Sequence, residues 1–183
     1  MGFIEETGVA QHYRDARITA IYEGTNGIQA NDLVGRKLMR DSGAGFNALM
    51  TEMDGTVSEF SSDLAIVQRF TDYQKQLKNT AAFILENAAE SASFEGAISY
   101  NFLMQMGYVC GAWYHLRSFK VAQTKLDAAS GDAQFNANKQ LAATFFVNQL
   151  LPRAAAYSEA VVIGSQVGCE LSEAAFSLSL IHI

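Results

Sequence analysis

The sequence predicts an all-α fold, a helical bundle. Three observations support this: the 183 residues include a single proline, apolar side chains recur at steps of three and four, and no β-branched run alternates strictly with polar residues. A chain almost free of proline can form long helices, and the three-and-four spacing places apolar side chains on one helix face. Because 49% of the residues are hydrophobic and 17% are charged, the chain can bury a substantial core.

The first two helices are expected at residues 4–17 and at residues 26–40. Gly8 is a weak point of the first helix. Thr25 or Asn26 can cap the second, since either side chain can accept a hydrogen bond from a free backbone N–H group. We expect the apolar side of this second helix to consist of Ile28, Leu33, Val34 and Leu38.

A break follows at residues 41–45, which read Asp-Ser-Gly-Ala-Gly, and it is the best internal boundary. Helices are predicted over residues 46–60 and 64–92, with Ser-Ser-Asp at residues 61–63 as the stop and the new cap. The second of these helices carries six candidate core residues: Ile66, Phe70, Tyr73, Leu77, Phe83 and Ile84.

A long helix is predicted over residues 93–128, capped by Ser93. Its large apolar residues repeat at steps of four and three, which puts them on one face: Phe102, Met106, Val109, Trp113 and Leu116. Such a stripe could line a ligand pocket, but helical spacing is more typical of core. A last helix begins near residue 133 after a Ser-Gly-Asp break and carries Phe145, Phe146 and Leu150. It should kink or restart at Pro152.

The uncharged stretch at residues 96–116 raises the question of a membrane span. Ser99, Asn101 and Gln105 lie inside it, so a buried bundle helix explains it better. Within this stretch, Gly107 and Gly111 have the small-residue spacing that admits a close neighbouring helix.

Composition excludes several other classes of protein. The net charge is −6 and the basic residues are scattered, so no patch is predicted to bind nucleic acid. Cys110 and Cys169 lie far apart without a CxxC pair, which favours reduced thiols in a cytosol-like compartment, although a disulfide stays open. No signal peptide is visible. His12 and His115 are isolated, and no residues have metal-ligand spacing, so no metal site is expected.

The most specific signal lies in the first forty residues. Residues 13–18 read Tyr-Arg-Asp-Ala-Arg-Ile, and residues 21–29 read Ile-Tyr-Glu-Gly-Thr-Asn-Gly-Ile-Gln. Glu23 stands at a helix–helix junction, where apolar neighbours can raise a carboxyl pKa and keep it ready as a base. Gly24 lets a ligand approach the backbone, and the start of the next helix offers free N–H groups. Taken alone, this pattern fits an ordinary capped helix start as well as a catalytic turn.

The two strings together resemble the signature of the acyl-CoA dehydrogenases. The match covers residues 1–40, and the opening Met-Gly-Phe resembles the end of that family's Gly-Gly-x-Gly-Tyr segment. Residues 30–38, Ala-Asn-Asp-Leu-Val-Gly-Arg-Lys-Leu, look most like the subgroup with an extra helical C-terminal domain, which includes the 3-methylmercaptopropionyl-CoA dehydrogenases. Residues from 41 onward resemble that extra domain more loosely.

The resemblance implies a reaction and roles for five residues. Glu23 matches the base that removes a proton from the α-carbon of an acyl-CoA thioester, while FAD accepts a hydride from the β-carbon to leave a trans-2-enoyl-CoA. Gly24 matches a substrate-contacting position. Thr25, Asn26 and Gly27 match a stretch that contacts FAD, although some relatives carry glutamine in place of Gly27.

The resemblance also divides the chain. Residues 1–42 would be the end of the family's C-terminal α-domain, and residues 43–177 an additional C-terminal helical domain. Residues 178–183, Leu-Ser-Leu-Ile-His-Ile, are encoded by codons that resemble a common transposon-end sequencing adapter. We expect them to be an artefact, and the chain to be a fragment that lacks the family's N-terminal helical domain and middle β-barrel.

Without those domains the fragment should bind FAD poorly and be inactive alone. The implied partners of the parent enzyme are an acyl-CoA, an electron-transfer flavoprotein and a second copy in a homo-oligomer, in a bacterial-like cytoplasm. Arg14, Asp15 and Arg17 are expected to form an ion-pair network that fixes the helices around the Glu23 turn, and Glu5 and Glu6 to belong to a solvated first turn. Two alternatives stay open: a non-catalytic helical oligomerisation module, and an acyl-CoA oxidase-type flavoprotein.

Overall fold

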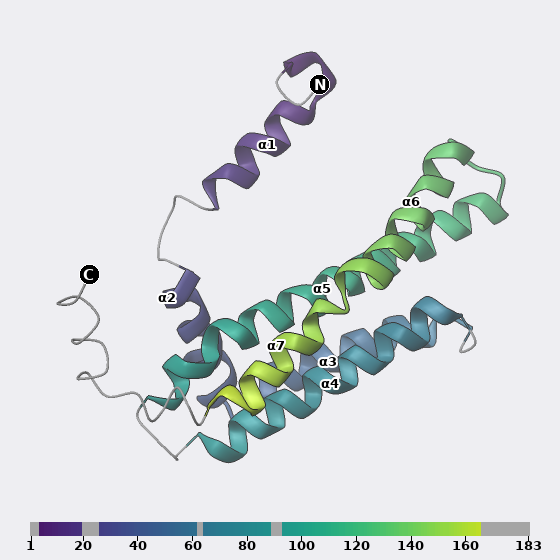
Figure 1. Ribbon diagram of the computed structural model, residues 1–183. Coiled ribbons are helices and arrows are strands. Elements are labelled where there is room, and N and C mark those ends of the chain that lie inside the picture. Colours follow the sequence, from purple (N-terminus) through teal and green to yellow (C-terminus); the bar gives the residue numbers. More distant parts are fainter. Residues whose placement is uncertain (1–3, 20–25, 62–63, 89–92, 166–183) are drawn as a thin grey trace.

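The computed structural model describes residues 4–19, 26–61, 64–88 and 93–165 (Figure 1). Every regular element in these ranges is a helix and none is a strand, so the predicted all-α fold is confirmed. The long α5 runs the length of the bundle, the α6–α7 run returns along it, and α4 packs against both α5 and α7, with α3 beside α4 and α5.

The first element is a 3-10 turn, η1 (Glu5–Thr7), followed by α1 (Val9–Ile18). Gly8 separates them with a φ of 72°, a left-handed conformation that glycine adopts without steric cost. The predicted weak point is therefore a break between two elements. Within α1 only Ala10 is buried, and the helix extends away from the bundle in Figure 1.

The second predicted helix consists of α2 (Asn26–Asn31) and a π-helix, η2 (Asp32–Met39). Val34 and Leu38 are buried and Leu33 is half-buried, as expected. The placement of Ile28 on the same face was wrong, because its side chain is 60% exposed. Six residues separate Ile28 from Val34, which is one full turn of α-helix plus about two-thirds of a turn. The Ile28 side chain therefore points to a different side of the helix from that of Val34.

The predicted break lies between η2 and α3 (Ala44–Ser58). Its backbone is left-handed at Ser42 (φ 53°) and at Gly43 (φ 80°). The Asp41 carboxylate accepts hydrogen bonds from the N–H groups of Gly43 at 3.0 Å and Gly45 at 2.9 Å. Because Asp41 satisfies these free donors, α3 begins two residues earlier than the sequence predicted.

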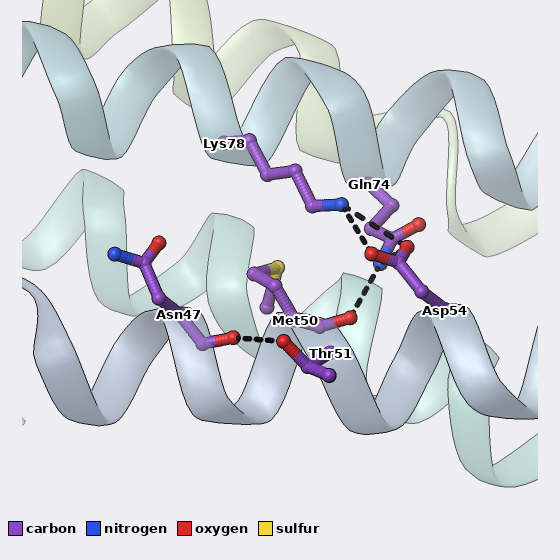
Figure 2. Close-up of polar contacts among 6 residues, drawn as sticks. All are labelled: Asn47, Met50, Thr51, Asp54, Gln74 and Lys78. Atoms are coloured by element: carbon purple, nitrogen blue, oxygen red, sulfur yellow. Dashed lines mark hydrogen bonds and ion pairs between the residues drawn. The ribbon is translucent and has the colours of Figure 1, made fainter.

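A polar link joins α3 to α4 (Ala65–Asn87), as Figure 2 shows. Gln74 is 2% exposed, and its Nε2 donates to the Met50 carbonyl at 3.2 Å and to Asp54 Oδ1 at 2.8 Å. Lys78 Nζ lies 2.9 Å from Asp54 Oδ2. This link fixes the register of the two helices, since the buried amide is bonded to two successive turns of α3. Helix α4 ends at Asn87, before its predicted end at residue 92. Of the predicted stop and cap at residues 61–63, Ser62 and Asp63 lie outside the described residues.

The longest helix is α5 (Phe94–Asp127). Its predicted stripe is core: four of the five residues are buried and Met106 is half-buried. On α4 the candidate core residues Ile66, Phe70, Leu77 and Ile84 are buried, whereas Tyr73 and Phe83 are half-buried against them. Val34 and Leu38 of η2 belong to the same continuous core.

After α5 the chain returns through α6 (Ala133–Phe145), a π-helix η3 (Phe146–Leu150) and α7 (Arg153–Val162). Asp132 caps α6 by accepting a hydrogen bond from the Phe135 N–H at 3.0 Å. The predicted restart at Pro152 is confirmed, since α7 begins directly after it. Of the apolar residues named for this last predicted helix, Phe145 is 60% exposed.

The two glycines of α5 differ in their surroundings. A Cβ added at Gly111 would lie 2.7 Å from the ζ carbon of Phe146, whereas one added at Gly107 would meet nothing within 4 Å. The close approach predicted for this pair is therefore confirmed for Gly111 alone. Among the described residues, no helix is long and apolar enough to cross a membrane.

Candidate functional site

The candidate site lies at the junction of α1 and α2. Glu23, Gly24 and Thr25 are outside the described residues. Asn26 and Gly27 open α2, and both are exposed. The first N–H groups of a helix have no partner within it, so the exposed Asn26 and Gly27 carry backbone donors that a ligand can use.

The α2–η2 segment is anchored to the bundle just after these residues. Ala30 is fully buried, and α2 packs against α5. Further along, a Cβ added at Gly35 would lie 2.7 Å from Oε1 of Glu95, in the first turn of α5. The glycine lets η2 and α5 approach this closely. Sequence reasoning missed this contact, because it joins residues sixty positions apart and neither belongs to a local motif.

A cavity of about 270 Å³ lies beside η2, between it, α3 and α5. Its walls include Leu33, Phe46, Phe102 and Met106, and Arg36 lies at its rim. Arg36 is paired with Asp32 one turn earlier at 3.2 Å. Phe102 and Met106 therefore serve the core and also line this small apolar cavity.

The ion-pair network expected around the Glu23 turn stays a prediction, because residues 20–25 lie outside the described residues. In the described part, Arg14 Nη1 lies 2.8 Å from Oε1 of Glu5, so Arg14 links α1 back to η1. Asp15 and Arg17 form no ion pair within the described part of the chain. The pair between Arg14 and Glu5 is solvent-exposed, and pairs of this kind contribute about 0–1 kcal/mol.

The described thiol and imidazole groups lie away from the motif. Cys110 is a free, half-buried cysteine, and burial raises the pKa of its thiol. His115 stacks on Phe146 with ring centroids 4.5 Å apart. Burial and then the charge of Lys139 lower the pKa of His115. His12 is exposed, and Cys169 lies outside the described residues. Within the described ranges, no three His, Cys, Asp or Glu side chains are grouped to hold a metal ion.

Comparison with known proteins defines the class of protein. The model of the acyl-CoA dehydrogenase C-terminal domain matches residues 1–38, and the model described as acetyl-CoA dehydrogenase C-terminal like matches residues 49–172. The second match covers most of the chain, and the all-helical fold agrees with it. The chain belongs to the acyl-CoA dehydrogenase family.

Individual relatives point to the subgroup with additional C-terminal helices. The chain is 42% identical over 157 residues to 3-methylmercaptopropionyl-CoA dehydrogenase of Ruegeria pomeroyi, a match that covers 82% of this chain and 26% of the relative. It is 30% identical over 190 residues to a broad-specificity linear acyl-CoA dehydrogenase of Mycobacterium tuberculosis, which covers 96% of this chain and 30% of the relative.

A third relative matches a short stretch of the chain. Bovine mitochondrial short-chain specific acyl-CoA dehydrogenase is 53% identical over 38 residues, 21% of this chain and 9% of the relative. The chain spans less than a third of the length of each of these curated relatives.

Proposed function

We propose that the full-length protein carrying this chain is an FAD-dependent acyl-CoA dehydrogenase. It would convert an acyl-CoA thioester to a trans-2-enoyl-CoA. The observation that carries the proposal is the Tyr-Glu-Gly-Thr-Asn-Gly string at residues 22–27 in a chain of this family, with relatives named as acyl-CoA dehydrogenases along nearly its whole length.

Glu23 is the proposed catalytic base. An α-proton beside a thioester carbonyl becomes acidic when that carbonyl accepts hydrogen bonds, because the negative charge then develops on a stabilised oxygen. In this proposal the backbone N–H of Glu23 donates one such bond, and the Glu23 carboxylate takes the proton. Gly24 has no side chain to obstruct the thioester, which supports its role as a substrate contact.

Thr25, Asn26 and Gly27 are the proposed FAD contacts. The exposed Asn26 amide and the bare backbone of the exposed Gly27 suit the carbonyl and phosphate acceptors of a flavin nucleotide. FAD, when bound, supplies the acceptor for the β-hydride. The residues of this chain then hold the substrate between the base and the cofactor, which is the geometry that the concerted loss of proton and hydride needs.

The rest of the full-length protein is needed for this site. Val9, Tyr13 and Ile18 of α1 are 47%, 67% and 51% exposed. We propose that the missing domains cover these side chains, since exposed apolar side chains gathered on one short helix favour a packing partner. The isolated chain should accordingly bind FAD poorly and show no activity.

Further features of the full-length protein remain proposals. We propose that residues 1–42 and 43–177 belong to successive domains, that residues 178–183 are not native, and that the protein works in the cytoplasm as a homo-oligomer. An electron-transfer flavoprotein is the proposed electron acceptor.

The test is to recover the full-length gene and assay the purified protein. We expect bound flavin, and bleaching of its absorbance under anaerobic conditions by at least one member of a panel of straight-chain and methylthio-substituted acyl-CoAs. Faster turnover with ferrocenium than with oxygen would support a dehydrogenase over an oxidase. A protein that binds no flavin, or whose flavin no acyl-CoA reduces, would overturn the proposal.

A further inference from the structure

The apolar cavity beside η2 reaches into the core of the bundle. Leu38, Phe46 and Phe102 line it, and these residues are 1%, 8% and 0% exposed. The rings of Phe46 and Phe102 have centroids 6.4 Å apart and are tilted against each other by 46°. Three half-buried side chains complete the apolar lining: Leu33, Leu49 and Met106. The cavity is therefore a hollow in the packed interior, with apolar walls from η2, α3 and α5.

The size and character of this hollow suit a small aliphatic group. Its volume is about 270 Å³, and an apolar cavity of about 150 Å³ can bind the six carbons of benzene. By that measure the hollow accommodates an apolar body of about eight carbons. Water finds few hydrogen-bond partners against such walls, whereas an aliphatic chain gains free energy by leaving water for them. Met106 can adjust to a ligand, because its thioether side chain is flexible.

The mouth of the cavity is charged. Its rim carries three exposed side chains: Arg36, Lys37 and Asp41. Arg36 is paired with Asp32 at 3.2 Å, and the Asp41 carboxylate accepts two backbone N–H groups at the start of α3, where the helix dipole favours negative charge. Lys37 forms no ion pair with any of the described residues. The charge without a partner at the mouth is therefore positive, and it attracts an anionic head group.

This arrangement favours a small ligand over a protein surface as the occupant. A domain packed across the mouth would take the three charged side chains out of water, which is costly unless each of them finds a partner. The cores of protein–protein interfaces are accordingly depleted of charged residues. A small amphiphile avoids this cost, because its apolar body fills the hollow while the charged rim stays hydrated. We propose that the cavity binds an aliphatic carboxylate of about eight carbons, with its chain against Phe46 and Phe102 and its carboxylate beside Lys37.

Titration calorimetry of the 183-residue chain with octanoate tests the proposal. Octan-1-ol serves as the uncharged comparison, because it carries the same aliphatic body without the carboxylate. We expect saturable one-to-one binding of octanoate with a Kd of about 1 mM or below. The measurement needs neither FAD nor an acyl-CoA, so its outcome does not depend on the proposed catalytic function.

Three variants locate the ligand in the cavity. Lys37→Glu should weaken octanoate binding about tenfold, because two carboxylates then face each other, and should leave octanol binding unchanged. Lys75→Glu is the matched control: it reverses an exposed cation on α4 that does not line the cavity, and it should change neither affinity. Leu49→Trp fills the hollow and should weaken both ligands more than about tenfold. If circular dichroism shows that Leu49→Trp is unfolded, Leu33→Trp takes its place.

The same titrations of the full-length protein show whether its other domains cover the mouth. Octanoate should still bind there, and Lys37→Glu should still weaken it about tenfold. The proposal is overturned if the isolated chain shows no saturable octanoate binding up to about 10 mM, or if the cavity-filling variant binds it as well as the unsubstituted chain. It is equally overturned if Lys37→Glu weakens octanoate no more than Lys75→Glu does, or if the full-length protein lacks the Lys37-dependent binding.

Discussion

Replacing Gln105 by methionine should stabilise the chain, whereas the same replacement at Gln74 should destabilise it. Both amides are buried, at 0% and 2% exposure, and both lie inside long helices. Methionine has a similar length and a similar helix propensity to glutamine, so the exchange mainly removes the polar amide. The sign of the effect then depends on what each amide bonds.

The expected magnitudes follow from those bonds. Neither Oε1 nor Nε2 of Gln105 has a hydrogen-bond partner among the described residues, and an unpaired buried polar group costs about 1–3 kcal/mol. Gln105→Met should therefore raise the free energy of unfolding by about 1–2 kcal/mol. Gln74 donates to the Met50 carbonyl and to the Asp54 carboxylate. Losing these two bonds should cost about 2 kcal/mol after the apolar gain of methionine.

Thermal unfolding followed by circular dichroism measures both effects. For a chain of this size, 1 kcal/mol corresponds to about 2–4 °C in Tm. We expect the two variants to lie on opposite sides of the unsubstituted protein. If Gln105→Met lowers Tm as much as Gln74→Met does, the Gln105 amide is well bonded and the reasoning is refuted.

Other substitutions test the packing and one titration. Gly111→Ala should lower stability by about 1–2 kcal/mol, because its methyl group would collide with the Phe146 ring. The added methyl group of Gly107→Ala would face open space, so this variant should raise the free energy of unfolding by about 0.5–1 kcal/mol through helix propensity. Urea denaturation of the two variants measures both effects. Equal changes in the free energy of unfolding would contradict the close contact at Gly111. Burial and Lys139 lower the pKa of folded His115 below 6.5. The unfolded chain then binds more protons below that pH, so this contribution to stability is complete above 6.5 and is lost as the pH falls toward the folded pKa. His115→Gln should flatten the dependence of Tm on pH between about 7.5 and 5, and an unchanged slope would show that other groups cause it.

Local patterns in the sequence predicted most of the bundle. Apolar spacing located the core of α4 and α5, because each helix buries the stripe that its period generates. The Asp-Ser-Gly-Ala-Gly string predicted the break before α3, and Pro152 predicted the restart at α7. These features depend on residues close together in the chain.

The features that were missed depend on residues far apart. The exposure of Ile28 follows from the actual register of α2 and η2, and the Gly35–Glu95 contact follows from how η2 meets α5. For the candidate site, the sequence motif predicted residues 23–27, and of these the structure describes Asn26 and Gly27.

The most direct test of the central proposal is anaerobic flavin reduction by the Glu23→Gln variant of the full-length protein. Glutamine keeps the size and polarity of the side chain but cannot take up the α-proton. The proposal predicts that the variant retains FAD at the level of the unsubstituted enzyme and that its flavin is not bleached by an acyl-CoA that bleaches the parent. Flavin reduction at the parental rate in the variant would show that Glu23 is not the base.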